Sequence, residues 1–201
     1  MQALINAGGK GSRMGRCGVE KPMQMLGDRP TIQRVLDALM ASENIDKIFV
    51  SVSDNTLRTE EYLKDRGVET IRTSGESFMH DLHTSFERMS GDYVLTCPSD
   101  LPLLTTRVVD AFIEYFDPRV MESAIAVVDE TTVRNLGITP SYTRESRGNQ
   151  WVLSGLCIMN RPRTIRGDYL DEVLFDTNWP ELAVNVNTMK ELDLARSFFR
   201  E

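Results

Sequence analysis

The segment that decides the fold follows a short apolar stretch, Gln2–Asn6, and reads Ala7-Gly8-Gly9-Lys10-Gly11-Ser12-Arg13-Met14-Gly15. The chain then continues as Arg16-Cys17-Gly18-Val19-Glu20-Lys21-Pro22. From Lys10 to Lys21 there are four cations and one anion, a local charge of +3 in a chain whose formal charge is −7. Glycines let backbone N–H groups approach an anion closely, and consecutive free N–H groups form a concave anion site. The sequence therefore predicts a polyphosphate-binding loop directly after the first strand.

Two other glycine-rich phosphate motifs do not match this loop. A P-loop requires Gly-x-x-x-x-Gly-Lys-Ser/Thr, whereas Gly9-Lys10 is followed by Gly11. A dinucleotide fingerprint requires Gly-x-Gly-x-x-Gly, whereas Gly15 comes one residue late. A flexible glycine loop with solvated charges is the remaining alternative, and the reversal of charge directly after a strand argues against it.

The remainder of the chain alternates between short apolar strands and amphipathic helices. Strands are expected at Gln2–Asn6, Lys47–Ser53, Val68–Arg72, Asp92–Cys97, Ser123–Val128, Trp151–Met159 and Leu182–Val186. Helices are expected at Pro30–Ala41, Leu57–Arg66, Ser77–Met89, Thr106–Phe116, Asp168–Phe175 and Thr188–Phe199. In the third helix, Phe78, Leu82, Ser85, Phe86 and Met89 are expected to face inward. This alternation predicts an α/β fold with a mostly parallel central sheet of about seven strands and helices on both faces.

Length and composition bound the class of protein. The 201 residues, 41% hydrophobic and 26% charged, suit one globular domain over residues 1–201. The polar segment Asp129–Gln150 is expected to be an excursion beside the ligand or at a subunit contact, which would make the protein a homodimer. The net negative charge argues against a nucleic-acid partner. The sequence contains no apolar run long enough for a membrane span, and the residues Met1–Gly9 are not expected to act as a signal peptide.

The cysteines and histidines carry little chemistry in this sequence. Cys17, Cys97 and Cys157 are an odd, widely spaced set, which is typical of reduced thiols and predicts a cytoplasmic location. His80 and His83 stand three residues apart on a helix, and too few further ligands accompany them for a zinc site.

The second candidate site residue is Asp100, in the turn Pro98-Ser99-Asp100-Leu101-Pro102 that follows the fourth strand. Ligands of open α/β sheets bind outside the carboxyl ends of the strands, and Mg²⁺ is typically held by one or two carboxylates plus substrate phosphates. Asp100 is therefore a candidate metal ligand, with capping of the next helix as the alternative. Asn187, after the last expected strand, is either a second ligand through its carbonyl oxygen or the cap of the last helix.

Two further segments are candidates for contact with a ligand. Thr73-Ser74-Gly75 is a polar loop after the third strand, in which Ser74, or Ser77 beyond it, could also cap the following helix. Gly155 lies inside a strand pattern, which indicates either the close approach of a ligand or backbone, or a bulge.

The pattern Leu-x-x-Ala-Gly-Gly-x-Gly-x-Arg-Met-Gly, followed by Glu-Lys-Pro, resembles the opening of the nucleotidyltransferases with a Rossmann-like, glycosyltransferase-A-type fold. These enzymes join an NTP to a phosphorylated acceptor and release pyrophosphate. The resemblance implies that the first loop holds the triphosphate, through Ala7, Gly8, Gly9, Lys10, Gly11, Ser12 and Arg13. It places Lys21 on the α-phosphate and Asp100 on Mg²⁺, with Asn187 where relatives often carry Asp. Arg13, Lys21 and Asp100 are the expected catalytic residues.

Finer detail narrows the resemblance. The first loop, Val19-Glu20-Lys21-Pro22, Thr73-Ser74-Gly75 with Asp81-Leu82 behind it, and Asn185-Val186-Asn187-Thr188 together look like the archaeal guanylyltransferases that join GMP to adenosylcobinamide phosphate in cobalamin assembly. Thr73, Ser74 and Gly75 would then lie over the guanine of GTP. Arg16-Cys17 departs from the pattern by lengthening the loop. The alternatives are molybdenum-cofactor guanylyltransferases, sugar-phosphate or other nucleotidyltransferases, and a nucleotide-binding module without turnover.

Overall fold

The computed structural model describes residues 1–14 and 18–199. Expectations about Gly15, Arg16 and Cys17 lie outside these residues. Seven strands form the path β10-β7-β9-β6-β1-β4-β5, and β8 pairs with β9 to complete a sheet of eight. Their bounds are β1 Gln2–Asn6, β4 Lys47–Val52, β5 Glu69–Arg72, β6 Tyr93–Pro98, β7 Ser123–Asp129, β8 Thr143–Ser146, β9 Asn149–Asn160 and β10 Glu172–Thr177.

Most neighbouring strands in this sheet run parallel, and β9 is the exception. It pairs antiparallel with β6, β7 and β8. Because β9 runs against its neighbours, its first half lies at the edge of the sheet where β1 and β6 end. A strand reversed in this way brings residues from its middle, rather than from the loop after it, to the edge where ligands bind.

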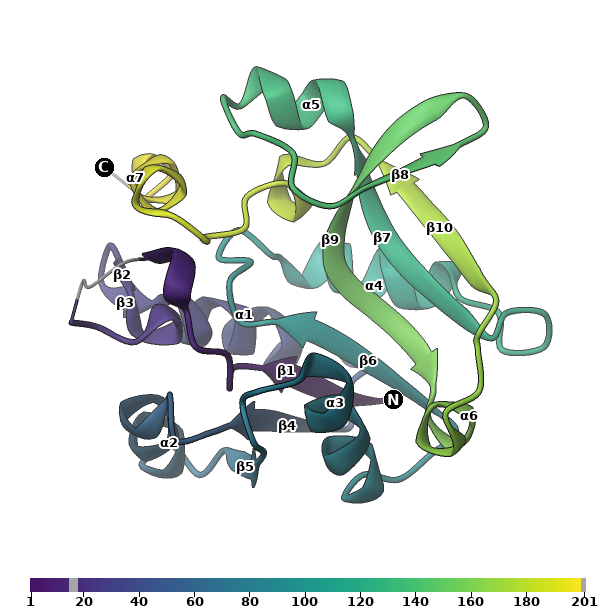
Figure 1. Cartoon of the computed structure of the whole chain (residues 1–201), viewed down its shortest axis with the longest axis horizontal. Coiled ribbons are helices and arrows are strands. Elements are labelled where there is room, and N and C mark those ends of the chain that lie inside the picture. The colour runs from purple at the N-terminus through teal and green to yellow at the C-terminus, as the bar shows by residue number, and fades with distance from the viewer. Residues whose placement is uncertain (15–17, 200–201) are drawn as a thin grey trace.

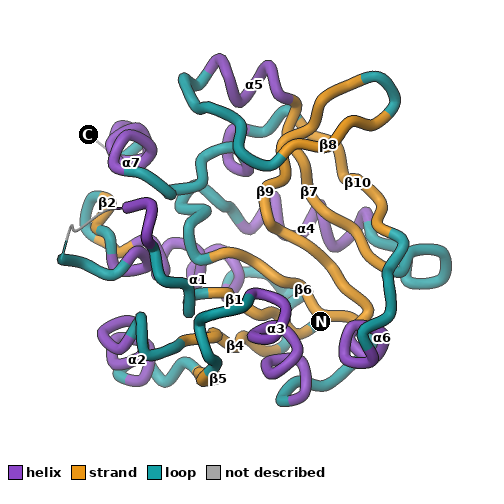
Figure 2. Tube along the Cα trace, in the orientation of Figure 1, coloured by secondary structure: helices purple, strands orange, loops and turns teal. Residues whose placement is uncertain are grey.

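Helices cover both faces of the sheet (Figures 1 and 2). Helices α1 (Thr31–Met40), α2 (Leu57–Lys64) and α4 (Thr106–Tyr115) pack on one face, together with Ala3 and Ile5 of β1. Helices α3 (Phe78–Glu87) and α6 (Arg161–Arg166) cover the other face, against Leu4 of β1. The alternation of β1 side chains follows from the twofold period of a strand, and it accounts for a stretch that is apolar throughout.

Smaller elements lie beyond the carboxyl edge of the sheet. They are the hairpin β2 (Met25–Leu26) and β3 (Arg29–Pro30), α5 (Glu130–Asn135), α7 (Met189–Ser197) and 3-10 turns at Ser12–Met14, Lys21–Met23 and Pro180–Leu182. A separate apolar cluster joins Met14 and Leu26 to Leu192 and Ala195 of α7. This cluster fixes the end of the first loop against the last helix. No helix in the described part of the chain has the length and apolar character needed to cross a membrane.

The predicted fold class is confirmed: the sheet is mostly parallel and carries helices on both faces. Two predicted elements are wrong. The helix expected at Asp168–Phe175 is replaced by strand β10, and the strand expected at Leu182–Val186 is a 3-10 turn followed by irregular chain. The ring of Phe175 packs against Phe112, Tyr115 and Trp179, so tertiary packing rather than local pattern selects the strand.

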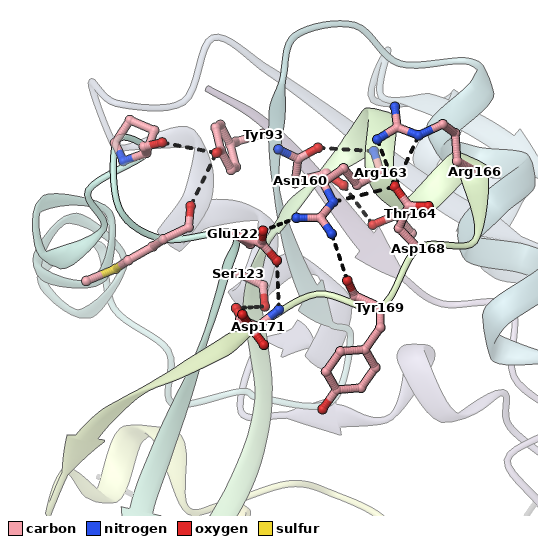
Figure 3. Close-up of polar contacts among 12 residues, drawn as sticks. Tyr93, Glu122, Ser123, Asn160, Arg163, Thr164, Arg166, Asp168, Tyr169 and Asp171 are labelled. Carbon is pink, nitrogen blue, oxygen red and sulfur yellow. Dashed lines mark hydrogen bonds and ion pairs between the residues drawn. The ribbon is translucent and has the colours of Figure 1, made fainter.

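The connection from α6 to β10 is held by a polar cluster at the amino ends of β7 and β10 (Figure 3). Arg163 of α6 forms an ion pair with Glu122 and donates to the carbonyl oxygen of Tyr169 at 3.1 Å. The other carboxylate oxygen of Glu122 accepts from the backbone N–H of Asp171 at 2.9 Å. These bonds direct residues 169–171 into the strand register, which a residue-by-residue pattern does not reveal.

The expected inward face of α3 is correct for its later turns and wrong at its start. Leu82, Ser85 and Phe86 are fully buried, whereas Phe78 is 61% exposed. Phe78 is the first residue of α3, and its side chain lines an open cavity described below instead of the core.

This difference within α3 gives a stability test. We expect Phe86→Ala to lower the free energy of unfolding by about 3–5 kcal/mol, since it removes a fully buried ring and leaves a cavity. Phe78→Ala should change it little. Chemical denaturation of both variants measures the difference, and equal losses would show that the assigned face of α3 is wrong.

Candidate active site

A polar cavity of about 260 Å³ lies at the carboxyl ends of β1 and β6. Strand β1 pairs with β4 on one side and with β6 on the other, so the strand order reverses between β1 and β6. Open α/β sheets bind ligands at such a point. Its lining includes nine predicted site residues: Ala7, Gly9, Lys10, Gly11, Ser12, Arg13, Lys21, Asp100 and Asn187. Asn6 and Ser99 also line it and were not predicted.

The glycine loop is tied to the turn after β4. The carbonyl oxygen of Gly8 accepts hydrogen bonds from Ser53 Oγ at 2.6 Å and Asn55 Nδ2 at 3.3 Å. A Cβ on Gly8 would stand 3.3 Å from Thr73 Oγ1, so Gly8 also lies against the third loop. Lys10 and Arg13 are exposed and line the cavity. The backbone is thus fixed while the cationic side chains stay accessible to an anion.

Lys21 connects three distant segments inside this cavity. Its ammonium group forms an ion pair with Asp100 Oδ2 and donates to Asn187 Oδ1 at 2.8 Å. The other oxygen of Asp100 accepts from Asn185 Nδ2 at 3.2 Å, and Asn185 Nδ2 also donates to the carbonyl oxygen of Ser154 at 3.1 Å. Both carboxylate oxygens of Asp100 are therefore satisfied, which permits its burial at 7% exposure.

The capping alternatives for Asp100 and Asn187 are not adopted. Helix α4 is capped by Thr105, and α7 is capped by Thr188, which forms a reciprocal capping box with Glu191. The side chain of Asn187 faces Lys21 instead.

The oxygen atoms around Lys21 suit a hard divalent cation. One carboxylate and one amide oxygen converge on the same ammonium group, and Mg²⁺ is usually bound by one or two carboxylates with substrate phosphates supplying further oxygens. Among residues 1–14 and 18–199, no three His, Cys, Asp or Glu side chains come together as metal ligands. The donor set therefore fits a cation that arrives with a phosphate ligand better than a cation held by protein alone.

The third loop is locked by Asp81 of α3. The Asp81 carboxylate accepts from Ser74 Oγ at 2.7 Å and from the backbone N–H of Gly75 at 3.1 Å. Neither serine caps α3 through its side chain: Ser74 bonds Asp81, and Ser77 occupies the cap position without a side-chain bond. The sequence places Asp81 one helical turn after the loop, and that spacing was the available signal for this contact.

A second, larger cavity of about 700 Å³ adjoins the first. Its wall is mainly apolar and includes Phe78 of α3, Ile138 and Tyr142 of the segment between α5 and β8, and Val152 of β9. Four residues line both cavities: Arg13, Pro98, Asp100 and Asn187. The two cavities therefore meet at Arg13 and Asp100, two of the three predicted catalytic residues.

Gly155 shows why β9 reaches this boundary. Its φ is +84°, a Cβ there would stand 3.1 Å from Pro98 Cγ, and the pairing of β7 with β9 shifts register between Ile125 and Val127. The bulge reading of this glycine is confirmed, since the register shifts across it, whereas its close neighbour is the ring of Pro98 and not another backbone.

The described thiols are protonated at neutral pH. Burial, reinforced by Asp100, raises the pKa of the Cys97 thiol well above its usual range, and burial raises the pKa of Cys157 to about 12. A neutral thiol is a poor nucleophile, so Cys97 and Cys157 are packing residues. Their part in the site is to fill space, and Cys157 does so in the wall of the larger cavity.

Comparison with known proteins defines the class. Residues 3–157 match the family model described as MobA-like NTP transferase domain, and the chain belongs to this family. The fold agrees: a nucleotidyl transferase from Methanothermobacter thermautotroptrophicus superposes with a TM-score of 0.72 at 18% identity, over 98% of this chain and 96% of that chain. A synthetase for CMP-2-keto-3-deoxy-manno-octonic acid, solved with CTP, superposes with a TM-score of 0.71 at 15% identity, over 98% and 97%.

Two curated relatives carry names that state a more specific activity. The chain is 39% identical over 121 residues to an adenosylcobinamide-phosphate guanylyltransferase of Methanocaldococcus jannaschii, which is 58% of this chain and 60% of that protein. It is 33% identical over 107 residues to a molybdenum cofactor guanylyltransferase of Histophilus somni, which is 52% of this chain and 51% of that protein. The chain thus spans between half and two thirds of the length of these relatives.

The packing of Gly75 gives a test of the site. A Cβ on Gly75 would lie 2.4 Å from Ser53 Oγ and 2.7 Å from the carbonyl oxygen of Gly8. We expect Gly75→Ala to weaken nucleotide binding at least about tenfold, a change of roughly 1.4 kcal/mol, because the third loop must move away from the first.

Gly67 is the matched control, since it has the same φ of +68° and nothing within 4 Å of its added Cβ. Gly67→Ala carries the same backbone strain without the steric conflict and should leave nucleotide affinity unchanged. Calorimetry on both variants separates the two effects, and equal affinity losses would contradict the packing argument.

Proposed function

We propose that this protein transfers GMP from GTP to adenosylcobinamide phosphate and releases pyrophosphate. The observation that carries the proposal is the meeting of two unlike cavities. A polar, glycine-lined cavity suits a triphosphate, and a larger, mainly apolar cavity suits a bulky acceptor. They share Arg13 and Asp100, so an acceptor phosphate at the boundary would be in position to attack the α-phosphorus. The 39% identity to the archaeal guanylyltransferase supports the same assignment.

The proposed roles follow from charge and position. Backbone N–H groups of residues 8–13, with Lys10 and Arg13, would bind the β- and γ-phosphates. Lys21 would move from Asp100 to the α-phosphate, where negative charge develops during transfer. Fixed cations at such a point stabilise the transition state, and positioning supplies most of the remaining catalysis. The acceptor phosphate is already anionic, so no general base is required.

Asp100 and Asn187 would hold Mg²⁺. When bound, Mg²⁺ supplies positive charge to the leaving pyrophosphate. Ser74 and Gly75, fixed by Asp81, would present backbone carbonyl and hydroxyl groups to the guanine edge. The cytoplasmic location and the homodimer stay predictions, as does the extent of the domain.

The chemistry of the larger cavity favours a corrinoid over a molybdopterin acceptor. Its walls carry Phe78, which is 61% exposed, and Tyr142, which is 63% exposed. Exposed aromatic side chains that line one cavity favour a ligand with a large apolar surface. Molybdopterin is smaller and more polar, and it would leave much of this wall in contact with water.

The proposed reaction is tested by pyrophosphate release with Mg²⁺, each of the four common NTPs, and adenosylcobinamide phosphate present or absent. We expect pyrophosphate release with GTP and with none of the other three NTPs, and only when the acceptor is present. Asp100→Asn should lower kcat at least about 100-fold with a smaller effect on GTP affinity, because the lost charge acts mainly in the transition state. Asp193→Asn, at an exposed position on α7, is the control. GTP binding without transfer to this acceptor would overturn the corrinoid assignment and direct the assay to molybdopterin and sugar phosphates.

The apolar wall gives a second test. We expect Phe78→Ala and Tyr142→Ala each to raise the KM for the acceptor about tenfold or more, since covering an aromatic side chain is worth about 1.5–3 kcal/mol. The KM for GTP should not change. Met79→Ala is the matched control, because Met79 is 60% exposed beside Phe78 and does not line the cavity. An unchanged acceptor KM in both variants would remove this wall from the acceptor site.

A further inference from the structure

Glu20 makes three hydrogen bonds at the start of α2, although it lies almost 40 residues away in sequence. Its Oε1 accepts from the backbone N–H of Arg58 at 2.8 Å. Its Oε2 accepts from the backbone N–H of Thr59 at 2.8 Å and from Thr59 Oγ1 at 2.6 Å. Glu20 directly precedes Lys21 and is the residue from which the 3-10 turn Lys21–Met23 begins.

These contacts replace a cap that α2 does not make for itself. The first N–H groups of a helix lack internal partners and are usually satisfied by the side chain of the cap residue. In α2 the cap residue is Thr56, whose side chain makes no capping bond and instead accepts from the backbone N–H of Ser53. The carboxylate of Glu20 fills this role from a distant segment, and its negative charge is favoured at a helix N-terminus.

The same stretch of chain also holds the glycine loop. Ser53 and Asn55, just before α2, bind the carbonyl oxygen of Gly8. Residues 53–59 therefore form a common platform: one end fixes the first loop, and the other end fixes Glu20 and with it the backbone of Lys21. Two phosphate-binding segments are held to one rigid element, which sets their separation.

We infer that Glu20 is a positioning residue for Lys21, acting by fastening the Lys21 segment to the N-terminus of α2. The inference rests on the proposed function for the role of Lys21 in transfer. It assigns Glu20 no contact with substrate. Without the Glu20 carboxylate, the residue directly before Lys21 loses its bonds to Arg58 and Thr59, and the ammonium group is no longer held at Asp100 and Asn187.

Acetylation of Lys21 tests this inference without requiring turnover. In the wild type, Lys21 is 18% exposed at its side chain and paired with Asp100, so mild N-hydroxysuccinimide acetate should modify it slowly. In Glu20→Ala, peptide mass spectrometry should show acetylation of Lys21 at least about fivefold faster, because the pairing geometry is released. Glu20→Gln, which retains one accepting oxygen, should be intermediate. Glu61→Ala, at an exposed position on α2, should match the wild type.

Kinetics then separate positioning from general destabilisation. We expect Glu20→Ala to lower kcat for GMP transfer about 30-fold in the wild-type background, since a misplaced group far from the chemistry can cost up to about 100-fold. In the Lys21→Ala background the same change should lower kcat less than about threefold, because both substitutions remove one interaction. A purely structural role would lower kcat equally in both backgrounds.

Failure of the inference about Glu20 and failure of the proposed function give different results. Unchanged acetylation of Lys21 in a folded Glu20→Ala overturns the inference, as does a kcat loss that persists in full in the Lys21→Ala background. Faster acetylation of Lys21 in a protein that transfers no GMP leaves the positioning by Glu20 standing and overturns the proposed function instead.

Discussion

The ion pair between Lys21 and Asp100 is the constraint around which the site is organised. An ammonium and a carboxylate that are largely removed from water must remain paired and hydrogen-bonded, because either one alone would be costly to bury. Here the pair also recruits Asn187 and Asn185, so it joins the 3-10 turn Lys21–Met23, the turn after β6 and the segment before α7. Those segments line the polar cavity together with the glycine loop. The shape of the cavity and the balance of its charges are therefore set by the same bonds.

Reversal of β9 divides the sheet into two halves that border different cavities. Strands β1, β4, β5 and β6 run parallel and end in the loops that approach the polar cavity. On the other side of β6, β9 runs backward and contributes Ser154 and Gly155 from its interior to the larger cavity. Asp100 lies just after the end of β6, at the border between these halves. One strand direction thus explains why two cavities of different character share a wall.

The sequence predicted the parts of the fold and site that depend on local chemistry. The glycine loop with its cations, Lys21, Asp100 and the alternating helices and strands all carry their signal in adjacent residues. The strand β10 was missed because the rings around Phe175 and the bonds of Glu122 and Arg163 decide it. The irregular chain at residues 183–187 was missed because Asn185 and Val186 bond to distant Asp100. Glu20 and Asn185 were missed as supporting residues for the same reason, since their partners lie 38 and 85 residues away.

The location of the apolar wall has a consequence for how such a protein can diversify. Ile138 and Tyr142 lie in irregular chain between α5 and β8, outside the hydrogen-bonded core of the sheet. Loops of this kind tolerate substitution and insertion far better than the elements they connect. Asp100 and Lys21, in contrast, are fixed by bonds to several segments at once. Under the proposed function, descendants of this chain can therefore exchange the surface that faces the acceptor while inheriting Lys21 and Asp100 unchanged.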